Sequence, residues 1–310
     1  MDNYQSKWEL CTEVEDDLSN FKNSLDNVLR LKGESNSKPI IEHISINLPP
    51  NGCHQNWNYL QKGKDWECDC RCKPSQSPIE INYEEGLFPL FLPAEFQFFN
   101  FEMKFLHVKN EKSTPIITCD SENFDCSMFS FAILINHQGK MFFCEEIRFH
   151  SPSEHIINGK QYDLELQLVC KSKNKRISSI ISLLVEGKVG YENSFFKKLD
   201  LVVILKTCQA GLNLGNINER NLESTKIRID EIFDIKKQNF NYFYYDGSMT
   251  NPPCNAHVDW YIVDEPIFIS LTDLVLIKDS IKDGGVEENN RGIQGRGERK
   301  VFYYSYDNLK

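Results

Sequence analysis

The sequence predicts a mainly β domain preceded by one N-terminal helix. From Trp57 onward, short apolar stretches alternate with turn-forming residues, which is the pattern of β-strands. Helical periodicity is scarce in this part of the chain, and its best example is the segment 219–233. The expected strands include 79–83, 96–108, 128–135, 140–149, 162–170, 177–184, 201–206 and 260–270.

The composition indicates a globular protein that buries a sizeable core. Of the 310 residues, 40% are apolar and 26% are charged, which is the usual balance for such a protein. The net charge of −10 argues against nucleic acid or an anionic membrane surface as a partner. No stretch of the sequence approaches the roughly 18 consecutive apolar residues of a membrane span, so we expect none.

The N-terminal sequence bears on the cellular compartment. MDNYQSKWEL has neither the basic region nor the apolar region of a secretory signal, which favours a cytoplasmic address. The eleven cysteines are then expected to be mostly reduced thiols. Their number alone would favour an oxidising compartment, so this expectation depends on the N-terminus.

Residues 1–32 are predicted to form an amphipathic helix. Ser6 and Glu9 have the spacing of a capping box, and Gly33 follows the last turn. Apolar residues recur at intervals of four and three, which is typical of a packing seam. The residues of this seam are Val14, Leu18, Phe21, Leu25 and Val28. The helix either packs on its own domain or docks into a groove of another protein.

The rest of the chain divides into an arm and one domain. Residues 33–56 contain three prolines and are expected to form a linker or an extended arm. The β-rich domain is assigned to residues 57–310. Within it, the Gly- and Asn-rich stretch 283–297 is expected to be an exposed loop.

Several motifs of the domain occur together in the order of one enzyme family. The motifs are QSPIEI at 76–81, HSPSEH at 150–155, NGKQYDLEL at 158–166, YDGSMTNPPC at 245–254, VDW at 258–260, EPI at 265–267 and a terminal segment at 290–304. Over roughly residues 57–305 the chain therefore resembles the α-type carbonic anhydrases. The resemblance implies a twisted, mostly antiparallel sheet of about ten strands, with small helices and a conical active site that reaches the sheet centre.

The resemblance also implies where a catalytic zinc would lie. In the family, one strand carries two alternating histidines and its neighbour carries a third, so that three imidazoles face one metal. Here the three positions are Arg148, His150 and Gln167. A guanidinium stays protonated and only donates hydrogen bonds, and a glutamine amide is a poor zinc ligand. We therefore expect neither zinc nor another cofactor.

Other polar residues could serve a rebuilt metal site or a purely structural role. Glu146 shares the strand face of Arg148, but the positions of His155 and Glu165 are buried polar groups in the family rather than ligands. A buried Arg148 needs a counter-charge, so we predict an ion pair with Glu146 or Glu154.

Two further residue pairs follow from the resemblance. Thr250 and Glu154 match a pair that orients zinc-bound hydroxide in the family, and without metal they are expected to form a buried hydrogen bond. Cys254 matches one partner of a family disulfide, and its counterpart here is Cys72 or Cys70. The Cys68-x-Cys70-x-Cys72 run lacks the spacing of a structural zinc site.

These residues favour a catalytically inactive relative of carbonic anhydrase that acts as a protein-binding subunit of a larger assembly. An organellar complex, or a cytoskeletal structure such as a ciliary axoneme, would suit such a subunit. One alternative is a carbonate dehydratase or hydrolase with a rearranged metal site. Another is an anion-binding module in which Arg148 holds bicarbonate or phosphate.

Overall fold

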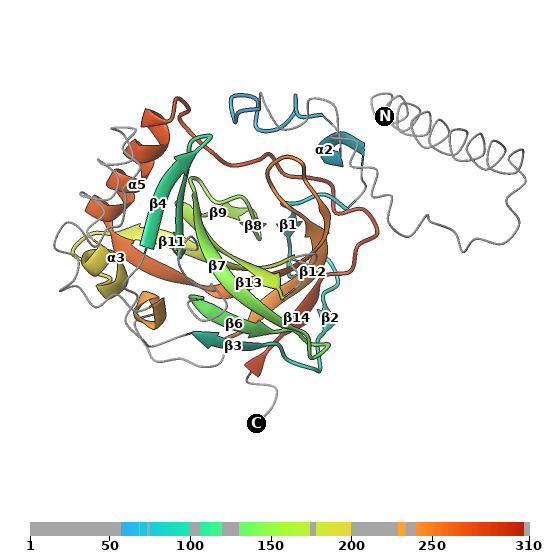
Figure 1. Cartoon of the computed structure of the whole chain (residues 1–310). Coiled ribbons are helices and arrows are strands. Elements are labelled where there is room, and N and C mark those ends of the chain that lie inside the picture. Colours follow the sequence, from blue (N-terminus) through green and yellow to red (C-terminus); the bar gives the residue numbers. More distant parts are fainter. Residues whose placement is uncertain are drawn as a thin grey trace, which may run out of the picture.

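The computed structural model shows one strongly curved β-sheet with short helices at its margins (Figure 1). It describes residues 57–67, 69–72, 75–98, 106–119, 130–173, 178–199, 229–233 and 240–306. The predicted N-terminal helix at 1–32, the arm at 33–56 and the expected strand at 201–206 lie outside these residues.

The large sheet has eleven strands and mixed direction. Along the sheet the order is β2-β14-β12-β13-β11-β10-β7-β5-β4, while β6 pairs with both β7 and β3. Two neighbouring pairs, β11–β13 and β14–β2, are parallel, and the others are antiparallel. The strands are β2 (Phe88–Pro89), β3 (Glu95–Phe98), β4 (Leu106–Glu111), β5 (Thr114–Cys119), β6 (Ala132–Ile135), β7 (Met141–His150), β10 (Leu164–Ser172), β11 (Ser178–Lys188), β12 (Tyr242–Ser248), β13 (Ala256–Ser270) and β14 (Phe302–Tyr304). The expected large and mostly antiparallel sheet is confirmed.

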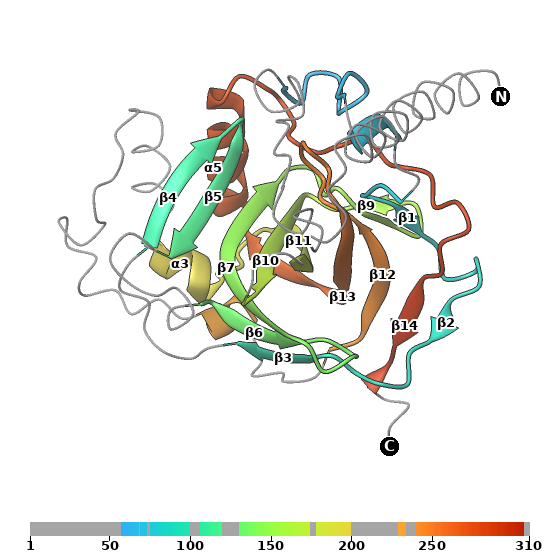
Figure 2. The ribbon, with the colours of Figure 1, turned by 45° about the vertical axis from the view of Figure 1, so that its right-hand side comes forward.

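A second, small sheet lies beside the large one (Figure 2). It consists of β1 (Glu80–Ile81), β8 (Ile156–Ile157) and β9 (Lys160–Gln161) in the order β1-β8-β9. The strand predicted at 79–83 is therefore present but shorter than expected.

The central strands are apolar on both faces because each face packs on a separate core. On β10, Leu166 and Leu168 belong to one apolar cluster, whereas Val169 belongs to the other. Alternate residues of a strand point to opposite faces, so a strand covered on both sides reads as a continuous apolar run. This arrangement buries β10 from Leu164 to Cys170 and places any polar residue there in a closed environment.

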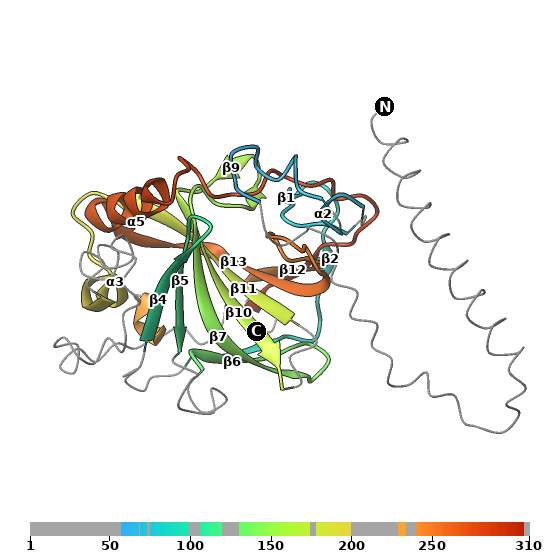
Figure 3. The ribbon, with the colours of Figure 1, turned by 45° about the horizontal axis from the view of Figure 1, so that its top comes forward.

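The longest described helix, α5 (Leu271–Asp283), was not expected from the sequence. It begins directly after β13, and the Ser270 hydroxyl accepts a hydrogen bond from Asp273 N as an N-cap. Its buried residues, including Ile277 and Ile281, pack the helix against β5, β11 and β13 (Figure 3). The other described helices are short: α2 (Asp69–Cys72), α3 (Ser194–Leu199) and the 3₁₀ turn η5 (Ile229–Ile232). Of the helix predicted at 219–233, only this turn lies within the described residues.

The prediction of an exposed loop at 283–297 was wrong for its central part. The backbone is irregular there, but Asn289, Asn290 and Arg291 are buried. Asn289 accepts from Ser151 N and donates to the Phe149 carbonyl, and Arg291 donates to the Ser77 carbonyl. A Gly- and Asn-rich composition does not reveal such long-range contacts. Among the described residues, no helix is both long and apolar enough to cross a membrane.

Candidate functional site

The three positions expected to correspond to zinc ligands lie together on β7 and β10. These strands are antiparallel neighbours (Figure 2). Gln167 lies directly opposite Arg148, and Glu165 lies directly opposite His150. Arg148 and His150 are two residues apart and therefore share one face of β7. The structure thus brings the three positions together, and their side chains decide what the site can bind.

Arg148 is held by two neighbours instead of pointing to solvent. Its Nε donates to the Glu146 carboxylate two residues earlier on β7. Its Nη1 donates to the Asn251 side-chain oxygen, 2.8 Å away, in the loop after β12. The side chains of Arg148 and Glu146 are only 16% and 11% exposed, so the two charges compensate each other in a largely dry environment. Glu146 is one of the two partners predicted for Arg148.

His150 keeps one ring nitrogen available. Its Nδ1 lies 2.9 Å from the Asn289 carbonyl oxygen, and because a carbonyl only accepts, Nδ1 carries the proton. The residue is 1% exposed, and its Nε2 has no hydrogen-bond partner among the described residues. A single imidazole does not make a zinc site, and no group of three His, Cys, Asp or Glu suited to a metal occurs in the described part of the chain.

The Gln167 amide is engaged in hydrogen bonds with two carboxylates and is not presented as a metal ligand. Its Nε2 donates to Glu154 Oε2 at 2.7 Å and to Glu165 Oε1 at 3.0 Å. Both acceptors are buried carboxylates, which fix the amide with its nitrogen toward them. The Gln167 Oε1 atom is buried and has no partner within the described ranges. The residues at the zinc position therefore do not fit zinc: one cation, one imidazole and one amide engaged elsewhere.

The expected hydrogen bond between Thr250 and Glu154 is absent from the described contacts. Glu154 Oε1 accepts from the backbone nitrogen of Arg291 at 2.9 Å, and Oε2 accepts from Gln167. Both carboxylate oxygens are thus occupied, one of them by the very side chain that replaces a ligand histidine. Thr250 is buried but does not reach this carboxylate by a hydrogen bond.

His155 belongs to a closed network beneath the site. Its Nδ1 lies 3.0 Å from Glu165 Oε1 and its Nε2 lies 2.8 Å from the Tyr245 hydroxyl. Glu165 also accepts from Ser182 Oγ at 2.8 Å. Burial raises the pKa of Glu165, but the charge of His155 and these hydrogen bonds outweigh it and bring the pKa to about 2. His155 and Glu165 are therefore structural groups here.

A small cavity opens between Arg148 and His150. Its volume is about 30 Å³, which is room for one or two water-sized molecules. The residues that line it are Trp57, Tyr59, Glu111, Thr114, Ile116, Arg148, His150 and Asn251.

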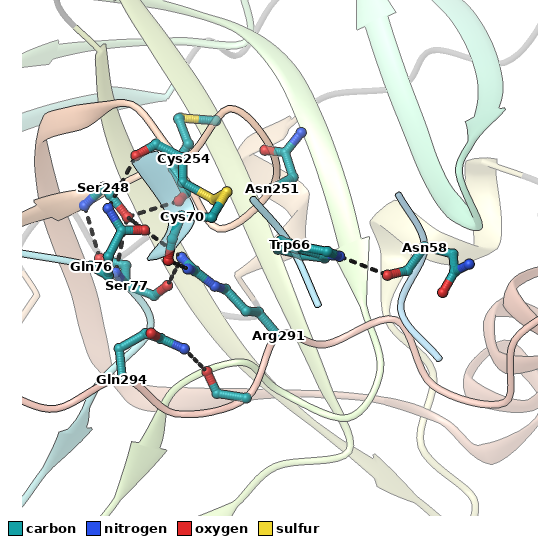
Figure 4. Close-up of a disulfide and its surroundings, with 12 residues drawn as sticks. Asn58, Trp66, Cys70, Gln76, Ser77, Ser248, Asn251, Cys254, Arg291 and Gln294 are labelled. Atoms are coloured by element: carbon teal, nitrogen blue, oxygen red, sulfur yellow. Dashed lines mark hydrogen bonds between the residues drawn. A yellow bond between two sulfur atoms is a disulfide. The ribbon is translucent and has the colours of Figure 1, made fainter. Parts of the chain in front are cut away.

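The disulfide of Cys254 is formed with Cys70 and not with Cys72 (Figure 4). The two Cα atoms are 4.9 Å apart, and both cysteines are buried. Because residues two apart in a helix lie on different sides of it, α2 presents one cysteine of this pair to Cys254. A second disulfide, Cys144–Cys170, joins β7 to β10 and was not expected from the sequence.

Sequence reasoning missed two residues that organise the site. Asn289 binds His150 Nδ1 through its carbonyl and Ser151 N through its side chain. The buried Arg291 guanidinium donates to carbonyls of Ser77 and Cys70 (Figure 4). The only signal was the place of Arg291 in the motif at 290–304, which Asn289 directly precedes; the motif marks a family position but not a contact.

Comparison with known proteins places the chain in a family. A model of the eukaryotic-type carbonic anhydrases matches residues 54–305. The chain belongs to the eukaryotic-type carbonic anhydrase family. Among solved structures, the α-carbonic anhydrase of Thermovibrio ammonificans, in complex with the inhibitor sulfanilamide, superposes with a TM-score of 0.58 at 26% identity. That match covers 75% of this chain and 88% of the other.

The relatives of this chain include both carbonic anhydrases and dioscorins. Alpha carbonic anhydrase 4 of Arabidopsis thaliana is 34% identical over 159 residues, which is 51% of this chain and 53% of the relative. The chain thus matches only about half the length of that relative. Dioscorin DB3S of Dioscorea polystachya is 25% identical over 256 residues, or 82% of this chain and 84% of the relative. Family membership therefore fixes the fold and leaves activity to the residues of the site.

We predict that Glu146→Gln destabilises the protein by about 2 kcal/mol, because it leaves the Arg148 charge largely buried without its carboxylate. Urea unfolding would measure the change. Glu192→Gln is the control, because it removes the carboxylate of an exposed ion pair with Lys197. Equal changes in the free energy of unfolding in the two variants would contradict the proposed stabilisation by the ion pair.

A second prediction concerns acid stability. The folded-state pKa of Glu165, about 2, lies below its ordinary value of 4.5, so its stabilising effect is complete above pH 4.5 and is lost as pH falls toward 2. Glu165→Gln should lower the free energy of unfolding at pH 7 by on the order of 3 kcal/mol and flatten its decline in this window. Glu192→Gln, at an exposed site, should change neither. An unchanged pH profile in Glu165→Gln would refute this assignment.

Proposed function

We propose that this chain is a catalytically inactive member of the carbonic anhydrase family that serves as a structural, protein-binding subunit of a larger assembly. The observation that carries the proposal is the ion pair of Arg148 with Glu146 at the place of the first zinc ligand. A guanidinium has no lone pair to offer a metal, and its positive charge repels a dication. Gln167 supports the same conclusion because its amide nitrogen is turned toward two carboxylates.

A rearranged metal site has less support. Glu146 is engaged by Arg148, and Glu165 is engaged by His155 and Ser182. Recruiting either carboxylate for a metal would leave a buried cation or imidazole without its partner, which is costly. The same ion pair weighs against the anion-binding alternative, since Glu146 already balances the charge of Arg148.

Restoring the two missing histidines tests the loss of catalysis. The wild-type chain should hydrate carbon dioxide no faster than buffer, because no zinc-bound water is available as a nucleophile. The double variant Arg148→His/Gln167→His should bind zinc, since His150 already presents a free Nε2 on the same face. The single variant Arg148→His is the control, with two ligands only. Hydration by the wild type above background would overturn the proposal.

The partner-binding role rests on the N-terminal segment. Residues 1–32 carry a predicted apolar seam, which suits insertion into a groove of another protein.

Removal of this segment tests the docking role. In extracts of the cells that make the protein, the full chain should elute from a sizing column as part of a larger complex. A chain lacking residues 1–32 should elute as a monomer. Leu18→Asp with Leu25→Asp should act like the deletion, whereas Asn20→Asp, one position outside the seam, should not. Retention of the truncated chain in the complex would contradict the proposal.

A further inference from the structure

We propose that the cavity between Arg148 and His150 binds the hydroxyl group of a small neutral alcohol, such as a polyol. Binding of a hydroxyl group at this site would need no metal, and it is an activity beyond the proposed function. The cavity of about 30 Å³ accepts a hydroxyl and its carbon but not a large ring.

The first requirement comes from His150. Its Nδ1 donates to the Asn289 carbonyl, so its Nε2 carries a lone pair and can only accept. This atom is buried and has no partner in the described part of the chain, and His150 lines the cavity. An unpaired buried acceptor costs roughly 1–3 kcal/mol, so a ligand that donates a proton to it is favoured. A fully deprotonated anion cannot do this.

The second requirement comes from Arg148. Two of its N–H groups donate to Glu146 and Asn251, and a guanidinium has five. Its remaining donors favour a ligand that also accepts a hydrogen bond. A hydroxyl meets both requirements with one atom, because it donates its proton and accepts through its oxygen.

The charge around the cavity selects against an anion. Arg148 contributes one positive charge, which the Glu146 carboxylate beside it balances. An anion would therefore gain little net attraction from Arg148. A neutral ligand needs no uncompensated charge in the pocket.

Aromatic and apolar groups complete the pocket. Trp57 and Tyr59 line it with their rings 5.4 Å apart in an edge-to-face contact, and Ile116 adds an aliphatic surface. These groups suit the carbon skeleton of an alcohol, while the polar groups of Arg148 and His150 take its hydroxyl. Bound water alone would use the polar groups but not this apolar wall.

Nuclear magnetic resonance of the ¹⁵N-labelled full chain tests the site. Glycerol is the neutral probe, and formate is the small anion used for comparison. We expect glycerol to shift the His150 Nε2 resonance saturably and formate to leave it unchanged. His150→Leu should weaken the glycerol-dependent shifts of neighbouring amides about tenfold, the effect of one lost hydrogen bond. Ile116→Val, which keeps every polar group, should bind within about twofold of the wild type.

Three outcomes would overturn the proposal. The first is the absence of a saturable shift at His150 with glycerol, which would leave the cavity to water. The second is a saturable response to formate in place of glycerol. The third is equal glycerol binding by folded His150→Leu and by the wild type. The His150 signal of the wild type keeps the test decisive if that variant does not fold.

A separate observation concerns the compartment. We infer that the chain folds under oxidising conditions, because two disulfides, Cys70–Cys254 and Cys144–Cys170, lie inside the domain. All four cysteines are buried, so both bonds are shielded from reductants once the protein has folded. Bonds of this kind form and persist in oxidising compartments and are rare in the cytosol. These bonds weigh against the cytoplasmic address expected from the N-terminus.

Rapid alkylation of cells during lysis tests this inference. Peptide mapping without reduction should recover Cys144 joined to Cys170 and Cys70 joined to Cys254. The same sample, denatured and reduced before alkylation, is the control and should yield all four cysteines alkylated. Alkylation of Cys144 and Cys170 without prior reduction would overturn it.

Discussion

The ion pair of Glu146 and Arg148 on β7 is the interaction on which the site depends. It places a cation where the family fold would hold a zinc ligand, and it neutralises that cation within the same strand. Because both side chains are largely buried, neither can leave without exposing the other to an unfavourable environment. The pair therefore does more than remove a ligand: it closes the position to a metal.

The neighbouring residues are consistent with this closure. Gln167 donates into Glu154 and Glu165, so the carboxylates that lie around the former metal position are linked by an amide. Glu154 in turn accepts from the backbone of Arg291, and no hydrogen bond joins it to Thr250 among the described contacts. His150 Nε2 and Gln167 Oε1 are buried and have no hydrogen-bond partner among the described residues, and His150 lines a cavity of about 30 Å³. At the position matched to the family's metal centre, this chain has a small, nearly neutral pocket.

Much of this could be predicted from the sequence because ordered motifs identify strands and their faces. The alternation of Arg148 and His150 places both on one side of β7 in any β-strand, and an adjacent strand must supply the third residue. Contacts made by irregular segments could not be predicted in the same way. Asn289 and Arg291 lie in a stretch whose composition resembles a surface loop, yet both are buried by long-range contacts. Cys144 and Cys170 become partners only through the register of β7 and β10.

The central claim is that this position excludes zinc, and the zinc content of the full-length chain tests it most directly. Protein equilibrated with an equal concentration of zinc, then freed of unbound metal, would be measured by elemental mass spectrometry. The ion pair predicts far less than one zinc per chain, with the same value in His150→Leu. One zinc per chain that disappears in His150→Leu would contradict the account.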